Sequence, residues 1–502
     1  MALPSSRTGA FAVVAGSLLF ALAYSQSPLF SSNQNTYFLH GLAGAGVGHL
    51  SDDLIARSPD PFPVFSWLVE VSHRHWSDWL FHFYYLVILG TYAATLLSII
   101  DWLRPIRTDE ERLYVFFAAF VVVHALPFQH PLWWMQAGMA GQYVLGPVFQ
   151  PSVFGVLLVV SIERFLRHRP YAAVLTAAAS AAIHPSYTVC AALLIAAYAT
   201  HIAMREKKPA RAVSITGIGG ALLAAVVLVT WATFAPTSVE TTRQAQAILV
   251  HNRLPHHAVI GEWFGATEVL QLLLLGTAMY RVRSTPLFTT LAVPAVGALL
   301  LTFLQLVTGS DALALIFPWR VSVILVPISS AVVLDAAIRH LLARRGPLPM
   351  PWRRKMKAAA VAIIAVLAIV GVVSFLIRGA RYQNDRQGLI AFVRDSLAPG
   401  QLYLVPTRWE GFRLQTGAPL FVDYKTHPYR DVDVIEWYGR LRLAEAFYSA
   451  PDSTVLRQLR AAGVTHVILP DESADTPTGF GPAVYRGNGF GVYRLRDSPL
   501  TH

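Results

Sequence analysis

Long uninterrupted runs of apolar residues dominate the first three quarters of the chain. The longest lie at residues 79–100, 212–234, 286–307, 321–342 and 358–377. Each approaches the ~20 residues that an α-helix needs to cross about 30 Å of hydrocarbon. Shorter runs recur between them, separated by loops that carry charged residues. The pattern predicts a polytopic, mainly α-helical membrane protein.

We expect about eleven membrane helices before residue 378. Their approximate bounds are 9–25, 79–100, 113–128, 144–163, 171–184, 186–204, 212–234, 267–283, 286–307, 321–342 and 358–377. The first run is short and contains Ala21-Leu22-Ala23, a pattern typical of signal-peptidase sites, so it is either an anchor or a cleaved signal. The fifth and sixth helices meet at His184-Pro185, which predicts a tight hairpin.

The pattern changes after residue 377, where helical and strand-like periods alternate. Helices are predicted at 385–397, 432–448 and 453–462, and strands at 401–406 and 464–470. Two more strand-like segments flank Gly487-Asn488-Gly489, which is a hairpin signal. We therefore expect a transmembrane domain at 1–377 and a small water-soluble α/β domain at 378–502.

Composition agrees with a lipid environment. Hydrophobic residues make up 54% of the chain and charged residues 14%, and the mean hydropathy is +0.47. The net charge of +11 lies mainly in residues 1–377, where 25 Lys and Arg face 16 Asp and Glu. Membrane topology explains this basicity, so no nucleic-acid partner is expected. The single cysteine, Cys190, excludes an intrachain disulfide.

The basic residues gather in alternate loops. Arg7 and the loops at 104–112, 164–169, 205–211, 281–283 and 339–357 carry 20 Lys and Arg, whereas the intervening loops carry 5. The positive-inside rule places the N-terminus and the basic loops in the cytoplasm. An odd number of helices then makes the C-terminal domain extracytoplasmic. We expect a multi-pass protein of the inner (plasma) membrane.

Three external loops, 26–78, 128–150 and 235–266, are longer than a simple connection requires. Long loops on a rigid scaffold tend to carry function. The aromatic and Gly-rich segment around Trp133-Trp134-Met135 is typical of an interfacial or re-entrant element at headgroup level. It either anchors the protein or contacts a lipid substrate.

Carboxylates in the first loop are candidates for catalysis (Asp52 and Asp53) and for substrate binding (Asp60). Asp52, Asp53 and Asp60 lie in loop 26–78, and such groups can act as general bases or bind a divalent cation such as Mg or Mn. Adjacent Asp residues point in different directions, so at most one of Asp52 and Asp53 faces a cavity. Alternatively, the pair caps a helix that begins near Leu54.

Cationic and imidazole groups follow in the third loop. Arg253, His256, His257 and Glu262 form a set that can bind phosphate or help to hold a metal ion. The alternative is that they are ordinary surface residues, because neighbouring histidines are too close in sequence to form a standard metal motif.

Two further candidates lie at the external ends of helices. Arg320 begins the tenth predicted helix, where it would suit a lipid phosphate or would snorkel beside Trp319. His184, at the hairpin tip, either faces the same cavity or is a buried, hydrogen-bonded histidine.

One reaction would unite these groups. Transfer of a sugar from a polyprenyl phosphate to a hydroxyl needs a base for that hydroxyl and cations for the departing phosphate, but no general acid. The segments 408–413 and 423–429 of the C-terminal domain are polar and aromatic, as carbohydrate-facing surfaces often are. Loop packing is the alternative interpretation.

This combination resembles the GT-C superfamily of membrane glycosyltransferases, which have many helices, a carboxylate-bearing first external loop and an external C-terminal α/β domain. The resemblance spans nearly the whole chain. It implies a lipid-linked sugar donor and gives Asp52 or Asp53 the role of base or metal ligand. The chain departs from the better-defined branches, since it has neither a Trp-Trp-Asp motif nor a clean Asp-Glu pair.

A narrower similarity connects four segments to bacterial multi-pass membrane proteins that bring no assigned substrate. The segments are 33–37, 59–65, 253–257 and 421–429. Two rival classes therefore stay open. One is a transporter or lipid flippase, for which charged residues in mid-helix would be expected. The other is a non-catalytic scaffold that binds a protein partner.

Overall fold

The structure is a computed structural model that describes residues 7–125, 130–346, 348–384, 386–470, 480–487 and 489–495. The chain forms two compact units. Unit 1 comprises residues 1–26, 81–230 and 254–376, and unit 2 comprises 27–80, 231–253 and 377–502. Unit 2 therefore combines the first long loop and part of the third with the C-terminal segment.

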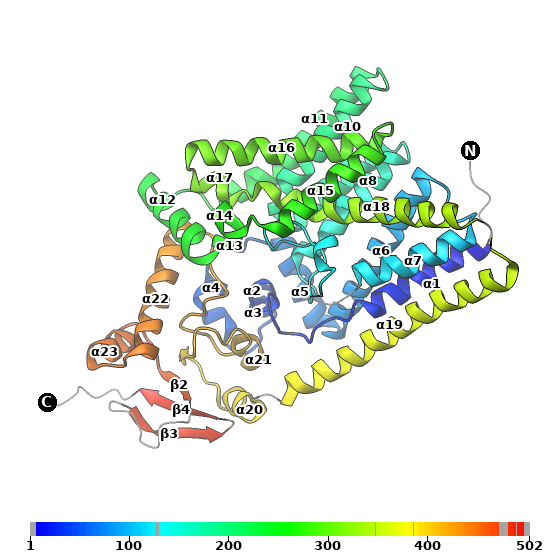
Figure 1. The fold of residues 1–502 in the computed structure, drawn as a ribbon. Coiled ribbons are helices and arrows are strands. Elements are labelled where there is room, and N and C mark those ends of the chain that lie inside the picture. Colours follow the sequence, from blue (N-terminus) through cyan, green and yellow to red (C-terminus); the bar gives the residue numbers. More distant parts are fainter. Residues whose placement is uncertain are drawn as a thin grey trace. The chain divides into compact units, whose positions relative to one another are not determined.

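Figure 1 shows the helices of unit 1, whose bounds follow the apolar runs of the sequence. Its longer helices are α1 (Arg7–Ala23), α6 (Trp79–Leu103), α7 (Glu110–His124), α8 (Val156–Leu166), α9 (Pro170–Ile183), α10 (Thr188–Met204), α11 (Pro209–Thr233), α15 (Ala266–Arg281), α16 (Pro286–Thr308), α18 (Ser322–Arg345) and α19 (Met350–Asn384). Short helical turns are η2 (Trp133–Met135), η3 (Pro151–Gly155), η4 (Pro185–Tyr187), α13 (Pro255–Ala258), α14 (Ile260–Trp263), α17 (Asp311–Leu315) and η6 (Pro318–Val321). The tight hairpin predicted at His184-Pro185 is confirmed, because only η4 separates α9 from α10.

Several of these helices could cross a membrane. Within the described residues, six are long and apolar enough: 79–103, 185–204, 209–233, 286–308, 311–345 and 350–382. Helices α7, α8 and α15 have only 15, 11 and 16 residues. A multi-pass helical protein is therefore supported, whereas the count of eleven spans stays a prediction.

Burial separates central from peripheral helices in unit 1. Helix α18 packs against α7 and α15 and is largely buried, whereas α11 and α19 leave most of their apolar side chains exposed. Such apolar faces suit lipid rather than water. The buried pair Arg112–Asp335, at 2.6 Å, connects α7 to α18.

The helix predicted at 144–163 is wrong in its N-terminal part. Residues 144–150 are irregular, η3 follows, and α8 begins only at Val156. Pro147 and Pro151 explain the difference, because proline lacks the N–H that a helix needs and favours extended backbone at the preceding residue. The predicted helix 113–128 is observed as α7, and residues 126–128 lie outside the described residues. Residue 488 of the predicted hairpin turn also lies outside them.

The irregular segment 136–150 is mostly buried within unit 1. The Tyr24 hydroxyl donates to the Leu145 carbonyl at 2.6 Å, and the Tyr85 hydroxyl donates to the Gly146 carbonyl. Non-helical backbone is tolerated in such surroundings only when its polar groups are paired in this way. The sequence predicts an interfacial or re-entrant element here. The structure shows an irregular segment that is packed among the helices of unit 1, and the depth of this segment in a membrane stays a prediction.

Unit 2 consists of short helices and one small sheet. Its elements are α2 (Gln34–Tyr37), α3 (Leu39–Gly44), η1 (Leu50–Asp52), α4 (Leu54–Arg57), α5 (Pro63–His75), α12 (Val239–Ile248), η5 (Leu249–Arg253), α20 (Gln387–Ser396), β1 (Tyr403–Leu404), α21 (Phe412–Thr416), α22 (Asp431–Ser449), α23 (Ser453–Ala461), β2 (His466–Pro470), β3 (Phe480–Gly487) and β4 (Phe490–Leu495). The predicted helices and strands of the C-terminal segment are confirmed within a few residues. Helix α21 was not predicted.

The sheet has the order β1-β2-β4-β3, with β1 parallel to β2 and the other neighbours antiparallel. Its core joins helix α20 to the strands and α21 through Leu389, Tyr403, Phe412, Ile468 and Val492. Alternation of apolar helix and strand faces around this core gives the α/β character that the sequence predicts.

The topology can be tested with a thiol-specific label that does not cross membranes. Because Cys190 is buried, it contributes little background. We expect Gln458→Cys, on the exposed face of α23, to react in right-side-out membrane vesicles, and Lys355→Cys, near the start of α19, to react only in inverted vesicles. Reaction of both cysteines from the same side would contradict the predicted orientation.

Candidate functional site

A buried arginine lies between two carboxylates in unit 2. Arg413 Nε donates to Asp53 Oδ2 at 2.7 Å, and Arg413 Nη1 donates to Asp423 Oδ2 at 2.7 Å. At most 1% of each side chain is exposed. Burial by itself lowers the pKa of the Arg413 guanidinium, but the two carboxylates outweigh it and raise that pKa. We call Asp53, Arg413 and Asp423 the buried ion triad.

Backbone donors hold both carboxylates of the triad. Asp53 is the N-cap of α4, with Oδ1 accepting from Ile55 N and Oδ2 accepting from Leu420 N, each at 2.9 Å. Asp423 Oδ1 accepts from Thr426 N at 2.6 Å. Of the two alternatives weighed for Asp53, helix capping is therefore the one observed. To act as a general base, the Asp53 carboxylate would first have to break its hydrogen bonds to Ile55 N, Leu420 N and Arg413.

The first loop and the C-terminal segment also approach at two glycines. His49 N donates to Gly417 O at 2.9 Å. Gly48 has φ +50°, and a Cβ added to it would lie 2.4 Å from Gly417 O. Gly417 itself has φ +74°. Only glycine fits both the backbone conformation and the close approach at Gly48.

Unit 2 also contains a cavity of about 230 Å³ with a polar and aromatic lining, which we call the Trp409 cavity. The first loop supplies Ser31, Ser32 and Asn35, and the C-terminal segment supplies Tyr382, Arg386, Ile390, Arg408, Trp409, Glu410, Gly411 and Gln415. Its volume is close to the lower end of typical small-molecule sites.

Two guanidinium groups of this cavity rest on aromatic rings. The Arg386 guanidinium carbon lies 4.4 Å from the ring centre of Trp409 and 4.9 Å from that of Phe490, and Arg408 lies 4.1 Å from that of Tyr424. Neither arginine forms an ion pair with a carboxylate in the part of the chain that the structure describes. Both positive charges are therefore available to an anion.

Asn35 lines the cavity, and its side-chain oxygen is buried. Its Nδ2 donates to Ser32 O at 3.1 Å, whereas Oδ1 is buried and has no hydrogen-bond partner among the described residues. Leaving a buried polar atom unpaired costs about 1–3 kcal/mol.

The other predicted residues of unit 2 have different surroundings. Asp52 is exposed at the end of η1. Asp60 Oδ1 accepts from Phe62 N at 2.8 Å beside a cavity of about 10 Å³, which has room for about one water. Arg253 is buried and donates to Lys425 O from Nε at 3.3 Å and from Nη2 at 2.7 Å.

Two predicted residues meet in unit 1. Arg320 Nη1 donates to His184 Nε2 at 3.1 Å and to Ser186 Oγ at 2.9 Å. The Arg320 Nε is buried without a hydrogen-bond partner among the described residues. The structure thus brings Arg320 and His184 together, which agrees with the sequence-based alternative that both face the same region.

The remaining candidates lie in or near α13 and α14 of unit 1. The rings of His256 and His257 are 4.0 Å apart, the His257 ring contacts the Ala140 carbonyl, and Glu262 is exposed. No three His, Cys, Asp or Glu side chains gather into a metal-binding group anywhere in the described ranges. A role for Mg or Mn stays a prediction.

Sequence reasoning missed the pairing of Arg413 and Asp423 with Asp53. One signal was available, because Arg413 stands between the apolar residues Phe412 and Leu414 in a short segment. A cation in that setting is buried only when carboxylates accompany it.

A family described as a domain of unknown function (DUF6798) matches residues 384–444. The matched segment contains Arg413 and Asp423 of the triad and the residues 386, 390, 408–411 and 415 of the Trp409 cavity. No curated protein matches this chain. The comparison therefore marks the segment of unit 2 that carries both features but assigns it no activity.

Replacing Arg413 tests the triad. We expect Arg413→Met to destabilise the protein by about 3–5 kcal/mol, because it leaves two buried carboxylates without their cation. Thermal unfolding of the purified protein measures the loss. Asp52→Asn, at an exposed neighbour of Asp53, should change stability by less than about 0.5 kcal/mol. Equal unfolding midpoints for the two variants would contradict a stabilising triad.

The buried His427 predicts acid sensitivity. Burial, and then the nearby Arg253 charge, lower the pKa of His427 to about 3. Since an unfolded histidine titrates near 6.5, stability is complete above about pH 6.5 and falls as the pH drops towards 3, by up to about 1.4 kcal/mol per pH unit. Unfolding midpoints at pH 7.5, 6 and 5 measure this slope. His427→Phe removes the one proton that the unfolded chain takes up here, so stability should fall less steeply with falling pH. An unchanged slope would show that groups other than His427 cause the acid sensitivity.

Proposed function

We propose that the protein is a GT-C-like membrane glycosyltransferase, which moves a sugar from a polyprenyl-phosphate-linked donor to an acceptor at the external membrane face. The Trp409 cavity is the observation that carries the proposal. It combines aromatic rings, two guanidinium groups without a carboxylate partner among the described residues, the Glu410 carboxylate and the side chains of Asn35 and Gln415. Guanidinium groups suit phosphate, and carboxylate and amide groups suit sugar hydroxyls.

The position of the cavity along the chain supports a lipid-linked substrate. Tyr382 lines the cavity and is also the last residue of the candidate span 350–382. The cavity residues Arg386 and Ile390 follow within a few positions. A phosphate at headgroup level, attached to a lipid in the bilayer, would therefore lie within reach of the end of this helix.

The proposed transfer needs one base and at least one cation. The base accepts the proton of the acceptor hydroxyl, whose oxygen attacks the anomeric carbon while the bond from that carbon to the phosphate oxygen breaks. Glu410 is the one carboxylate among the cavity-lining residues that the structure describes, and we assign it the base. Asp52 and Asp60 of the first loop are the alternative bases. Asp53 is less suited, because it is bonded to Arg413 in the buried ion triad.

Cations stabilise the departing polyprenyl phosphate. Arg386 and Arg408 would do so in unit 2. In unit 1, Arg320 has a buried Nε without a partner among the described residues, so it is the second candidate for a phosphate contact. Arg253, His256, His257 and Glu262 stay predicted substrate contacts.

Transport is the second candidate function, and one buried contact favours it. The Tyr92 hydroxyl lies 2.8 Å from His124 Nδ1, and His124 Nε2 lies 3.2 Å from the Ser330 hydroxyl, which connects α6, α7 and α18. A buried histidine among apolar helices often marks a polar pathway. The nearby Arg112–Asp335 ion pair joins the first turn of α7 to the interior of α18. The transferase remains the leading proposal because the Trp409 cavity offers both a carboxylate and cations.

Glycans and glycolipids of cells that lack the protein provide the test. We expect deletion to remove a sugar that the wild type restores, and Arg408→Ala or Glu410→Ala to reduce the restored amount about tenfold or more, because a charge-assisted contact contributes about 1.5–3 kcal/mol. Membrane amounts of each variant are compared by immunoblot.

Arg394→Ala is the matched control, because Arg394 is an exposed cation of α20 that does not line the cavity. It should restore the sugar fully. If deletion changes no glycan, or if all variants restore it equally, the transferase proposal fails. Asp52→Ala and Asp60→Ala, assayed alongside, decide which carboxylate is the base.

A further inference from the structure

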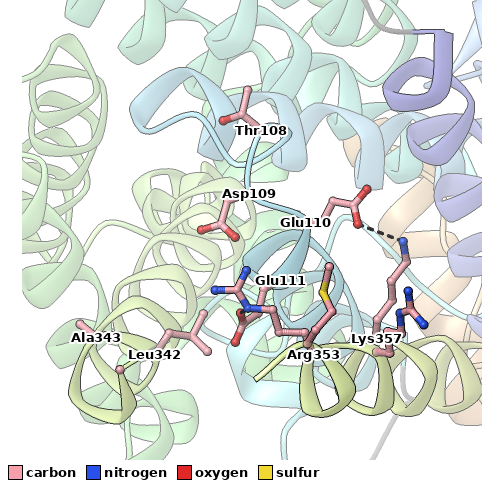
Figure 2. A pocket seen from close by; sticks show the side chains of 11 residues that line it. Thr108, Asp109, Glu110, Glu111, Leu342, Ala343, Arg353 and Lys357 are labelled. Atoms are coloured by element: carbon pink, nitrogen blue, oxygen red, sulfur yellow. Dashed lines mark hydrogen bonds and ion pairs between the residues drawn. The ribbon is translucent and has the colours of Figure 1, made fainter. Parts of the chain in front are cut away.

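A large cavity in unit 1 lies where two basic loops meet. Its volume is about 810 Å³, and it is lined by the start of α7, the end of α18 and the start of α19. The charged lining residues are Asp109, Glu110, Glu111, Arg353, Arg354 and Lys357 (Figure 2). The size is that of a site for a whole lipid headgroup.

The ion pairs across this cavity are weak. Arg353 Nε lies 3.5 Å from Glu111 Oε2, and Lys357 Nζ lies 3.1 Å from Glu110 Oε2, the pair that the dashed line marks in Figure 2. The Glu110 side chain is 76% exposed and Lys357 is 42% exposed, so water screens their attraction. Arg354 forms no ion pair with any described carboxylate. A ligand phosphate can therefore recruit all three cations.

The surroundings of the cavity are more basic than its walls. Residues 344–357 contain six Lys and Arg and no Asp or Glu. Three of the six, Arg344, Arg345 and Lys355, add positive charge to a lining whose own three cations face three carboxylates. The net potential therefore favours an anion over a zwitterion.

Apolar side chains beside the cations place this region at a lipid interface. Leu341, Met350 and Trp352 are each more than half exposed. Helix α19 continues from here as the candidate span 350–382. Cations in the first turns of a membrane helix, with a neighbouring Trp, lie at headgroup depth.

We propose that this cavity binds the headgroup of an anionic, hydroxyl-bearing phospholipid. Arg353, Arg354 and Lys357 bind the phosphate, and Glu111 accepts a hydrogen bond from a headgroup hydroxyl. The bound lipid would cross-link the starts of α7 and α19, and so stabilise the fold of unit 1. This site is independent of the proposed transferase chemistry.

Thermal unfolding of the full-length protein in a neutral detergent tests the proposal. Phosphatidylglycerol should raise the unfolding midpoint in a saturable way, whereas phosphatidylcholine, phosphatidylethanolamine and inorganic phosphate at the same concentration should not. Equal effects of phosphatidylethanolamine or phosphatidylcholine would overturn the preference for an anionic headgroup. An equal effect of inorganic phosphate would show a soluble anion site instead.

Variants locate the effect. Arg353→Gln/Arg354→Gln should weaken the apparent affinity for phosphatidylglycerol about tenfold or more, and Arg281→Gln/Arg283→Gln, which removes the same charge from another basic loop, should leave it unchanged. Equal weakening by both double variants would show a diffuse charge effect and overturn the site. Glu110→Gln removes a competing carboxylate and should strengthen binding, a gain that misfolding cannot mimic; a loss of binding would overturn the site.

Discussion

The guanidinium of Arg413 has almost no contact with water, and its charge is compatible with burial only because Asp53 and Asp423 lie 2.7 Å away on two sides. Removing Arg413 would leave two carboxylates without their cation in a poorly polarisable interior. Asp53 belongs to the first long loop, whereas Arg413 and Asp423 belong to the C-terminal segment. Within unit 2, the triad therefore joins distant parts of the sequence through a buried electrostatic contact.

The Trp409 cavity depends on the same contact. Helix α21 carries Arg413 into the triad and Gln415 into the cavity wall, so the ion triad fixes the helix that shapes the cavity. Asn35 comes from the first loop, which Asp53 holds against the C-terminal segment. Groups that could bind a ligand are thus placed by residues that never touch it, which is how a rigid supporting shell normally works.

The spacing of apolar residues predicted most helices and strands, because it reflects which side of each local element is buried. It failed at residues 144–150, where the apolar composition is that of a helix but Pro147 and the tyrosine hydroxyls impose another conformation. The candidate site was harder to predict. The capping role of Asp53 follows from its neighbours in sequence, whereas its pairing with Arg413 joins residues 360 positions apart, which no local pattern encodes. Arg320 and His184 were found because both stand at helix ends.

That separation also constrains the order in which the protein can mature. With synthesis at about 5–20 residues per second, Asp53 leaves the ribosome on the order of 20–70 s before Arg413 does. Throughout that interval the Asp53 carboxylate lacks its cation, so the first loop cannot acquire its final packing before α21 has been synthesised. Unit 2 can therefore be completed only after α19 has been synthesised, and a chain interrupted before α21 would expose an unfinished loop to quality-control proteases.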